Sequence, residues 1–313
     1  MNKELPEHIG DAEATKAVEA LAIHLNPKDE MQFFDPYLSV VSPPARHPRM
    51  DGGYKLWPEE APEREPDLRL MTIGNSTSLW PAYPWSSELG AMLTSDQRLV
   101  EVYHGAGKGS SSSQELMRVL RDAPAIKPNM IVGLSGICDI GYLLNDPKHP
   151  HLHKYANRVY QFAKDAGLVT RNLFFGPEDS ASPAEVWCRN QRFARVLADE
   201  MGINIITFLQ PVQGYGPYQQ TAEEKALFDS KAKAVLRGTG KTYGESVTEF
   251  YTEVLDIVSA RPKAYDHIVD FTAALEDCPG AYKDHRHQTP KGVTHLAKKM
   301  LPIVEKKLAE GRP

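Results

Sequence analysis

Short apolar runs alternate with longer amphipathic stretches from residue 68 onward. The runs are short enough for buried strands, whereas the stretches repeat their apolar residues every three to four positions, as helices do. Strands are predicted at residues 68–73, 99–103, 130–134, 203–209 and 267–271. Helices are predicted at residues 85–94, 112–122, 152–166, 184–201, 221–236, 243–260 and 290–309. Strands separated by helices predict an α/β fold, a three-layer α/β/α sandwich around a five-stranded parallel sheet.

The first 67 residues have a different pattern. Residues 11–25 have helical spacing, but eight prolines follow between Asn26 and Pro66. Proline fixes φ and removes an amide donor, so this stretch cannot form a long helix or a central strand. Its apolar side chains indicate that it packs on the rest of the chain. We therefore predict an N-terminal helix and Pro-rich arm over residues 1–67 and a main domain over 68–313.

Composition narrows the class of protein. Of the 313 residues, 41% are hydrophobic and 25% charged, which is typical of a globular chain with a full core. The net charge of −5 offers no basic excess for nucleic acid, and no apolar run is long enough to cross a membrane. The polar N-terminus lacks the apolar stretch of a signal peptide, so a cytoplasmic protein is expected. Three cysteines, far apart, form neither a disulfide framework nor a zinc spacing.

Four short motifs follow predicted strands. Ser76 comes directly after the first strand, a glycine-rich turn containing Gly109 follows the second, and Cys138 follows the third. Asp284 precedes His287 by three residues, after the fifth strand. Alone, each has a plainer interpretation: a helix cap, a tight turn, a core thiol and a polar loop. Because parallel strands end at one edge of a sheet, together they can supply a nucleophile, amide donors and a base oriented by a carboxylate.

These motifs, in this order, resemble the sequence blocks of the SGNH (GDSL-like) hydrolase superfamily. The resemblance covers about residues 68–310 and rests on segments 74–76 (GNS), 136–139 (GICD) and 284–287 (DHRH), together with Gly109. The family's aspartate before the serine is replaced by asparagine here, and its block-three asparagine by cysteine. The resemblance implies an SGNH/flavodoxin-like sandwich.

The resemblance also implies residue roles. Ser76 would attack an ester carbonyl, His287 would take its proton, and Asp284 would hold the imidazole. The backbone amides of Ser76 and Gly109 would stabilise the oxyanion, with Cys138 completing this oxyanion hole. No metal and no organic cofactor is implied.

Cys138 is the serious departure from the family. A thiol is a weak hydrogen-bond donor, and loss of one oxyanion donor typically costs about 10²–10³ in rate. Asn145 and Asn190 are candidates for a replacement donor.

The predicted function is hydrolysis of a carboxylic ester through an acyl-enzyme, with a small acyl group such as acetyl on a sugar or polar metabolite. The partner is then a small-molecule or glycan ester. Alternatives are an O-acyltransferase using the same serine and a non-catalytic binding protein that lost the asparagine. A metal-dependent hydrolase built on alternating histidines, such as His285 and His287, is a further alternative. The sequence carries no signal for an oligomeric state.

Further residues are predicted to contact the substrate. Trp80 and Tyr215 are aromatic residues in loops beside the proposed site, and Asn75 and Asp139 adjoin Ser76 and Cys138 in sequence. Arg286 is expected to pair with a nearby carboxylate, with an anion anchor as the alternative.

Overall fold

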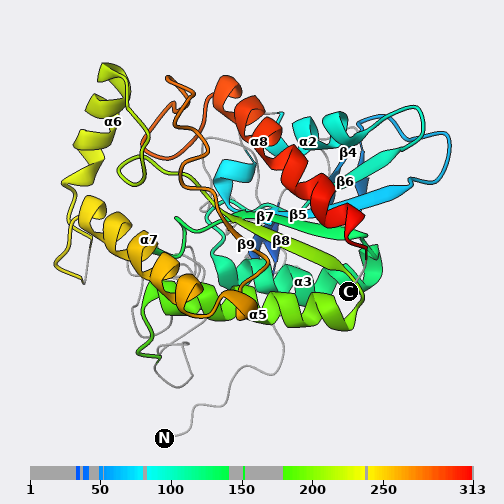
Figure 1. Cartoon of the computed structure of the whole chain (residues 1–313), viewed down its shortest axis with the longest axis horizontal. Coiled ribbons are helices and arrows are strands. Elements are labelled where there is room, and N and C mark those ends of the chain that lie inside the picture. Colours follow the sequence, from blue (N-terminus) through cyan, green and yellow to red (C-terminus); the bar gives the residue numbers. More distant parts are fainter. Residues whose placement is uncertain are drawn as a thin grey trace, which may run out of the picture.

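A seven-stranded sheet forms the centre of the molecule (Figure 1). The computed structural model describes residues 33–35, 38–41, 49–51, 53–79, 83–140, 151, 179–236 and 239–311. The strands lie in the order β3-β4-β6-β5-β7-β8-β9. The predicted helices at 11–25 and 152–166 lie outside the described residues.

Five adjacent strands of this sheet are parallel, as predicted. They are β5 (Leu68–Gly74), β6 (Val100–His104), β7 (Met130–Ser135), β8 (Asn204–Leu209) and β9 (Ile268–Asp270). The parallel part of the sheet starts with β5; β6 lies on one side of it, and β7, β8 and β9 follow in order on the other side. This order is the flavodoxin-like one, in which the crevice for a ligand lies at the carboxyl ends of the strands next to the point where the order reverses.

Two further strands extend the sheet and correct the predicted strand number from five to seven. β4 (Tyr54–Trp57) pairs antiparallel with β6, and β3 (Met50–Asp51) pairs antiparallel with β4. Both come from the Pro-rich arm, in a proline-free segment that ends just before Pro58. An antiparallel edge strand needs no crossover helix, so the alternation of runs and helices did not predict it. β1 (Phe33–Asp35) and β2 (Ser39–Val41) form a separate antiparallel pair.

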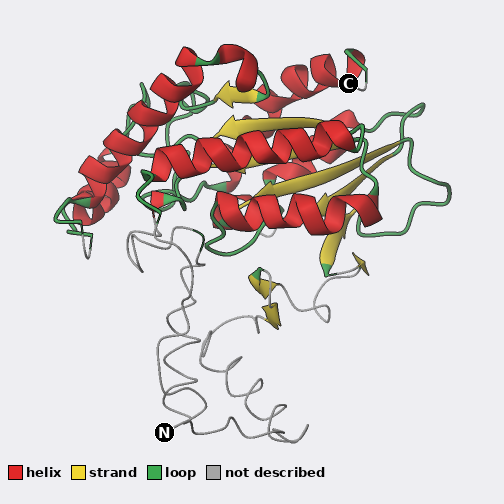
Figure 2. Cartoon of the chain, turned by 90° about the horizontal axis from the view of Figure 1, so that it is seen from below, coloured by secondary structure: helices red, strands yellow, loops and turns green. Residues whose placement is uncertain are grey.

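Helices cover both faces of the sheet (Figures 1 and 2). α2 (Trp85–Leu93) and α8 (Pro290–Ala309) pack against each other on one face, and α3 (Ser112–Ile126) and α5 (Pro183–Glu200) on the other. α7 (Tyr243–Ala260) packs against α5 and follows α6 (Ala222–Ala232). Short 3₁₀ helices lie at Ser76–Ser78 (η2) and Pro262–Ala264 (η4). The three-layer sandwich is confirmed.

Successive side chains of β5 point to opposite faces of the sheet and so pack against different helices. Leu70 lies in the core cluster with α2 and α8, whereas Met71 and Ile73 lie in the cluster with α3 and α5. All three side chains are fully buried. A strand buried on both faces has no polar face, which explains why the strands appear in the sequence as short apolar runs.

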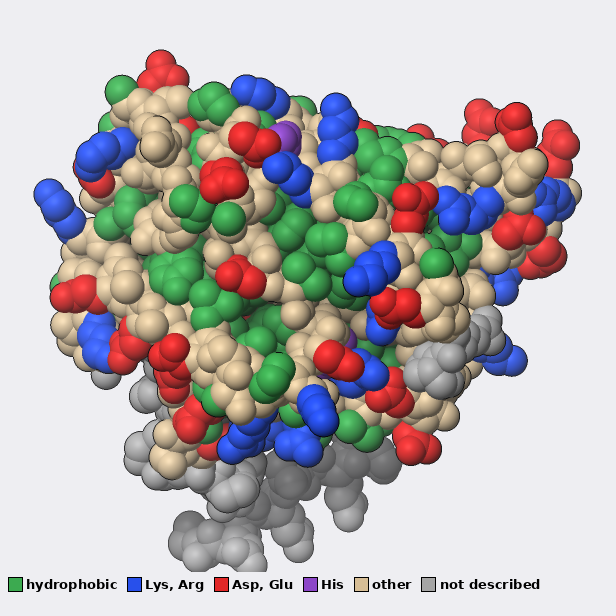
Figure 3. Space-filling view, in the orientation of Figure 1, with side chains coloured by type: hydrophobic (Ala, Val, Ile, Leu, Met, Phe, Trp, Pro, Cys, Tyr) green, Lys and Arg blue, Asp and Glu red, His purple; other side chains and the backbone are tan. Residues whose placement is uncertain are grey.

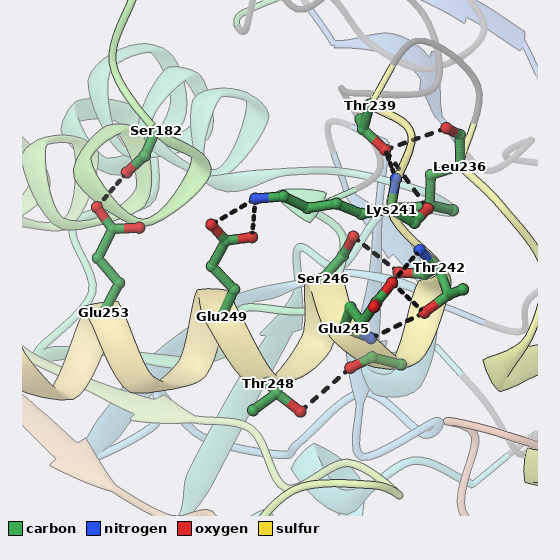
Figure 4. A network of polar contacts seen from close by, with 11 residues as sticks. Ser182, Leu236, Thr239, Lys241, Thr242, Glu245, Ser246, Thr248, Glu249 and Glu253 are labelled. Atoms are coloured by element: carbon green, nitrogen blue, oxygen red, sulfur yellow. Dashed lines mark hydrogen bonds and ion pairs between the residues drawn. The ribbon is translucent and has the colours of Figure 1, made fainter.

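Local sequence sets where the helices begin. Thr242 accepts a hydrogen bond from the backbone of Glu245, whose carboxylate accepts one from the Thr242 amide in return (Figure 4). α5 and α6 begin with the same capping box, built on Ser182 and Thr221. The six described helices agree with the predicted ones to within four residues at each end.

Leu70→Ala should destabilise the fold strongly, because it empties volume between the sheet and two helices. We expect a loss of about 2–5 kcal/mol in the free energy of unfolding, measured by urea titration. Leu120→Ala is the matched control, because Leu120 on α3 is 51% exposed. It should change that free energy by less than about 0.5 kcal/mol. Equal losses in the two variants would contradict the assignment of Leu70 to the core.

Candidate active site

The turn after β5 presents Ser76 at the carboxyl edge of the sheet. A Cβ on Gly74 would lie 2.6 Å from the carbonyl oxygen of Leu134, so the chain turns here only because no side chain is present. The side chain of Asn75 then accepts hydrogen bonds from the amide and hydroxyl of Thr77, at 3.0 and 2.9 Å. These bonds begin η2, whose first residue is Ser76.

Asn75 therefore has a different role from the predicted one. It is fully buried, and its side-chain amide donates a hydrogen bond of 2.6 Å to Gln210. Both polar atoms of the Asn75 side chain have partners inside the protein, and none of this side chain is exposed to a substrate. It holds the turn that carries Ser76.

His287 connects Ser76 with Asp284. The Oγ atom of Ser76 lies 2.9 Å from Nε2 of His287, a residue 211 positions away in the chain. Nδ1 of the same ring lies 2.8 Å from Oδ2 of Asp284. The structure thus brings the three predicted side chains into one hydrogen-bonded chain.

Asp284 is held in its ionised form. Burial by itself would raise the pKa of this carboxyl. The His287 ring and the backbone amides of His287 and Arg286 all donate hydrogen bonds to it, and together they hold its pKa well below the usual range. An ionised Asp284 accepts from Nδ1–H of His287, which leaves Nε2 as the acceptor for the Ser76 hydroxyl.

One segment after β8 contacts both halves of this arrangement. Gln210 pairs with Asn75, beside Ser76, while the Gln213 amide donates a 2.7 Å hydrogen bond to the backbone carbonyl of Asp284. Gln213 in turn accepts a hydrogen bond of 2.5 Å from Gln220. Gln210 and Gln213 are fully buried.

The sequence prediction did not include these two glutamines. The signal was present, because two long polar side chains follow directly on an apolar strand in the segment FLQPVQ. Spacing alone could not indicate their partners, which lie more than 70 residues away.

The glycine-rich turn after β6 runs beside the end of β5 and is hydrogen-bonded to it. The Gly105 amide donates to the carbonyl of Thr72 at 2.8 Å, and the Gly107 amide donates to that of Gly74 at 3.0 Å. Gly109 has φ +75°, which a residue with a side chain rarely adopts. Within the described part of the chain, the amides of Ser76 and Gly109 have no hydrogen-bond acceptor. Their role as oxyanion donors stays a prediction.

Cys138 lies after β7 in an apolar cluster that includes Trp187 and Tyr251. It is 7% exposed and not in a disulfide. Asn190 does not replace the missing asparagine, because its amide donates to the hydroxyls of Ser112 and Ser113 at 2.9 and 3.0 Å. Asn145 lies outside the described residues.

Asp139 is buried and hydrogen-bonded to Ser112, which corrects its predicted role in substrate binding. Its carboxylate accepts hydrogen bonds from the amide and hydroxyl of Ser112, at the start of α3. Glu115, on the same helix, accepts a bond of 2.6 Å from the hydroxyl of Ser135. Both carboxyls are almost completely buried. Burial raises the pKa of Asp139 to about 7, and burial together with the charge of Asp139 raises that of Glu115 to about 8.

Tyr215 lies in the loop between Gly214 and Gly216, half-buried, with its ring 5.1 Å from that of Tyr251. Its contact with a substrate stays a prediction. Trp80 lies outside the described residues. The described residues contain no group of three or more side chains suited to hold a metal ion.

Comparison with known proteins gives matches among solved structures. A catalytic mutant of Axe2, an acetylxylan esterase from Geobacillus stearothermophilus, is 14% identical, with a TM-score of 0.45 over 76% of this chain and 94% of that one. A GDSL-like lipase from Bacteroides thetaiotaomicron is 14% identical, with a TM-score of 0.43 over 76% and 88% of the two chains. The likeness is one of fold. No family model and no curated protein matches the chain.

Stability should depend on pH through Glu115. The unfolded chain releases this proton near the ordinary value of 4.5, whereas the folded protein retains it up to about 8. The free energy of unfolding therefore falls as pH rises between these values. Glu115→Gln removes the titration, so its stability relative to wild type should rise over this range by on the order of 5 kcal/mol.

Urea unfolding at about pH 5, 7 and 9 measures this difference. Glu276→Gln is the control, because Glu276 is exposed. Its difference from wild type should stay within about 0.5 kcal/mol at every pH. A pH-independent difference for Glu115→Gln as well would refute the buried titration.

Proposed function

We propose that this protein is a serine hydrolase that cleaves a carboxylic ester through an acyl-enzyme. The observation that carries this proposal is the hydrogen-bonded chain from Ser76 Oγ through the His287 ring to Asp284. This arrangement places a nucleophile, a base and an orienting carboxylate at the edge of the sheet where an α/β protein presents its crevice.

In the proposed reaction, His287 Nε2 takes the proton of the Ser76 hydroxyl as Oγ attacks the ester carbonyl. The oxyanion that forms is stabilised by the backbone amides of Ser76 and Gly109. His287 then gives its proton to the leaving alcohol, and a water molecule activated by the same ring releases the acid. Asp284, being ionised, stabilises the imidazolium in both steps.

Cys138 limits the oxyanion hole in this scheme. The two backbone amides are strong donors, but a thiol supplies only a weak third one. Esters need less stabilisation of the tetrahedral intermediate than amides, which favours an ester as substrate. A small acyl group such as acetyl, on a sugar or other polar metabolite, remains the proposed substrate and rests on the resemblance of the sequence blocks.

Partners other than a small ester have no support in the described residues. Acidic and basic side chains are interspersed over the face shown in Figure 3, which offers no continuous basic surface for nucleic acid. Among the described helices, none has the length and apolar character that a bilayer crossing requires.

Ser76 should react with a fluorophosphonate, because the adjacent imidazole removes its proton. Mass spectrometry of the labelled protein should place the adduct on Ser76, and Ser76→Ala should abolish both labelling and hydrolysis of p-nitrophenyl acetate. Ser230→Ala is the control, because Ser230 is an exposed serine on α6. It should leave both unchanged. An adduct on another serine would overturn the site.

Gln213→Ala should lower kcat and leave KM within about threefold. It removes the hydrogen bond that fixes the Asp284 backbone, and small misplacements of catalytic groups can cost about 10-fold or more in rate. Steady-state kinetics on p-nitrophenyl acetate measures the two constants. Gln219→Ala, at an exposed position of the same loop, is the matched control and should have neither effect. A normal kcat for Gln213→Ala would show that the bond is dispensable.

A further inference from the structure

Arg286 lies between Asp284 and His287 in sequence, and its guanidinium has no carboxylate partner. No ion pair with this arginine occurs in the described part of the chain, which corrects the pairing expected from the sequence. Its Nε atom is buried and has no hydrogen-bond partner. Partial burial of a guanidinium that has no partner costs free energy, and binding of an anion would offset this cost.

Tyr243, the first residue of α7, lies against the same segment, because its ring contacts the ring of His285, the neighbour of Arg286 in the chain. Its hydroxyl is buried and also has no hydrogen-bond partner. Burial raises the pKa of Tyr243, so its hydroxyl stays protonated, and the charge of Arg286 acts in the opposite direction. The protonated phenol can donate a hydrogen bond and the arginine N–H can only donate one, and neither of these donors has a partner in the described residues.

The surroundings add positive charge. Lys231 on α6 has its Nζ atom 6.0 Å from the centre of the Tyr243 ring and forms no ion pair with a described residue. The His285 ring contacts Tyr243 edge to face, with centroids 5.3 Å apart. Burial and the charge of Arg286 lower the pKa of His285 to about 4, so this ring is neutral at physiological pH. Asp284, the nearby carboxylate, is already hydrogen-bonded to His287.

We infer that the ester substrate carries an anionic group, a carboxylate, phosphate or sulfate, which binds to Arg286 beside the Tyr243 hydroxyl. This inference rests on the proposed ester hydrolysis and adds the charge class of the substrate. The anion would supply the partner that the guanidinium lacks, and Lys231 would attract it at longer range. Arg286 adjoins His287 in the chain, so the inference places the charged group near the scissile ester, on either its acyl or its alcohol part.

Two matched pairs of esters test this inference. 4-Nitrophenyl hemisuccinate beside 4-nitrophenyl butyrate places the charge on the acyl part. 4-Acetoxybenzoate beside its methyl ester places it on the alcohol part. For one of the two pairs, wild type should show a higher kcat/KM on the anionic member by about 10-fold or more, since charge-assisted hydrogen bonds are strong. The pair that shows the preference identifies the part that carries the charge.

Arg286→Gln should reduce that preference by about 10- to 100-fold. Lys233→Gln is the matched control, because it removes one exposed positive charge near the end of α6 and should keep the preference. The salt dependence of wild type is a second test that needs no variant. Added NaCl should lower kcat/KM for the anionic ester more than for the neutral one, because salt screens the attraction between charges.

The outcomes separate this inference from the proposed function. If neutral esters are hydrolysed and Ser76 is labelled, but wild type prefers neither anionic ester, the inference is wrong and the proposed function stands. An unchanged preference in Arg286→Gln would also overturn it. If no ester is turned over and Ser76 is not labelled, the proposed function fails, and the inference fails with it.

Discussion

The hydrogen bond between Ser76 and His287 joins two segments that are 211 residues apart in the chain. It exists because β5 and β9 end at the same edge of the sheet, with β7 and β8 between them. The turn after β5 carries the serine, and the loop before α8 carries the histidine and the aspartate. Any change in the register of these strands would separate them, so the apolar packing of the sheet is a condition of the site.

Buried side-chain amides complete this connection. Gln210 and Gln213 lie in one segment after β8, one hydrogen-bonded beside the serine and the other beneath the aspartate. The Oε1 atom of Gln210 accepts from Asn75 and the amide of Gln213 donates to Asp284, so these two contacts favour one arrangement of the segment, although Nε2 of Gln210 is buried without a partner among the described residues. The same segment continues into the loop of Gly214 and Gly216, which carries Tyr215 against Tyr251.

The carboxyl groups of Asp284, Glu115 and Asp139 differ in protonation state. Asp284 accepts three hydrogen bonds and remains ionised, whereas Glu115 and Asp139 are enclosed so completely that burial favours their protonated forms. The number of donors and the access of water decide this difference, not the residue type. Arg286 is the complementary case, a charge whose partner the described residues do not supply.

The sequence by itself determined the strand and helix pattern, because strands buried on both faces must be apolar and helices must show one apolar side. It also indicated Ser76, His287 and Asp284, because their motifs are short and follow strand ends. It could not indicate the edge strands from the Pro-rich arm, since antiparallel pairing leaves no periodic trace of its partner. The side chains of Asn75 and Asp139 adjoin the site in sequence, yet they face the interior. Only the tertiary structure decided their direction, because a hydrogen-bond partner 135 residues away for Asn75 is chosen by packing, not by spacing.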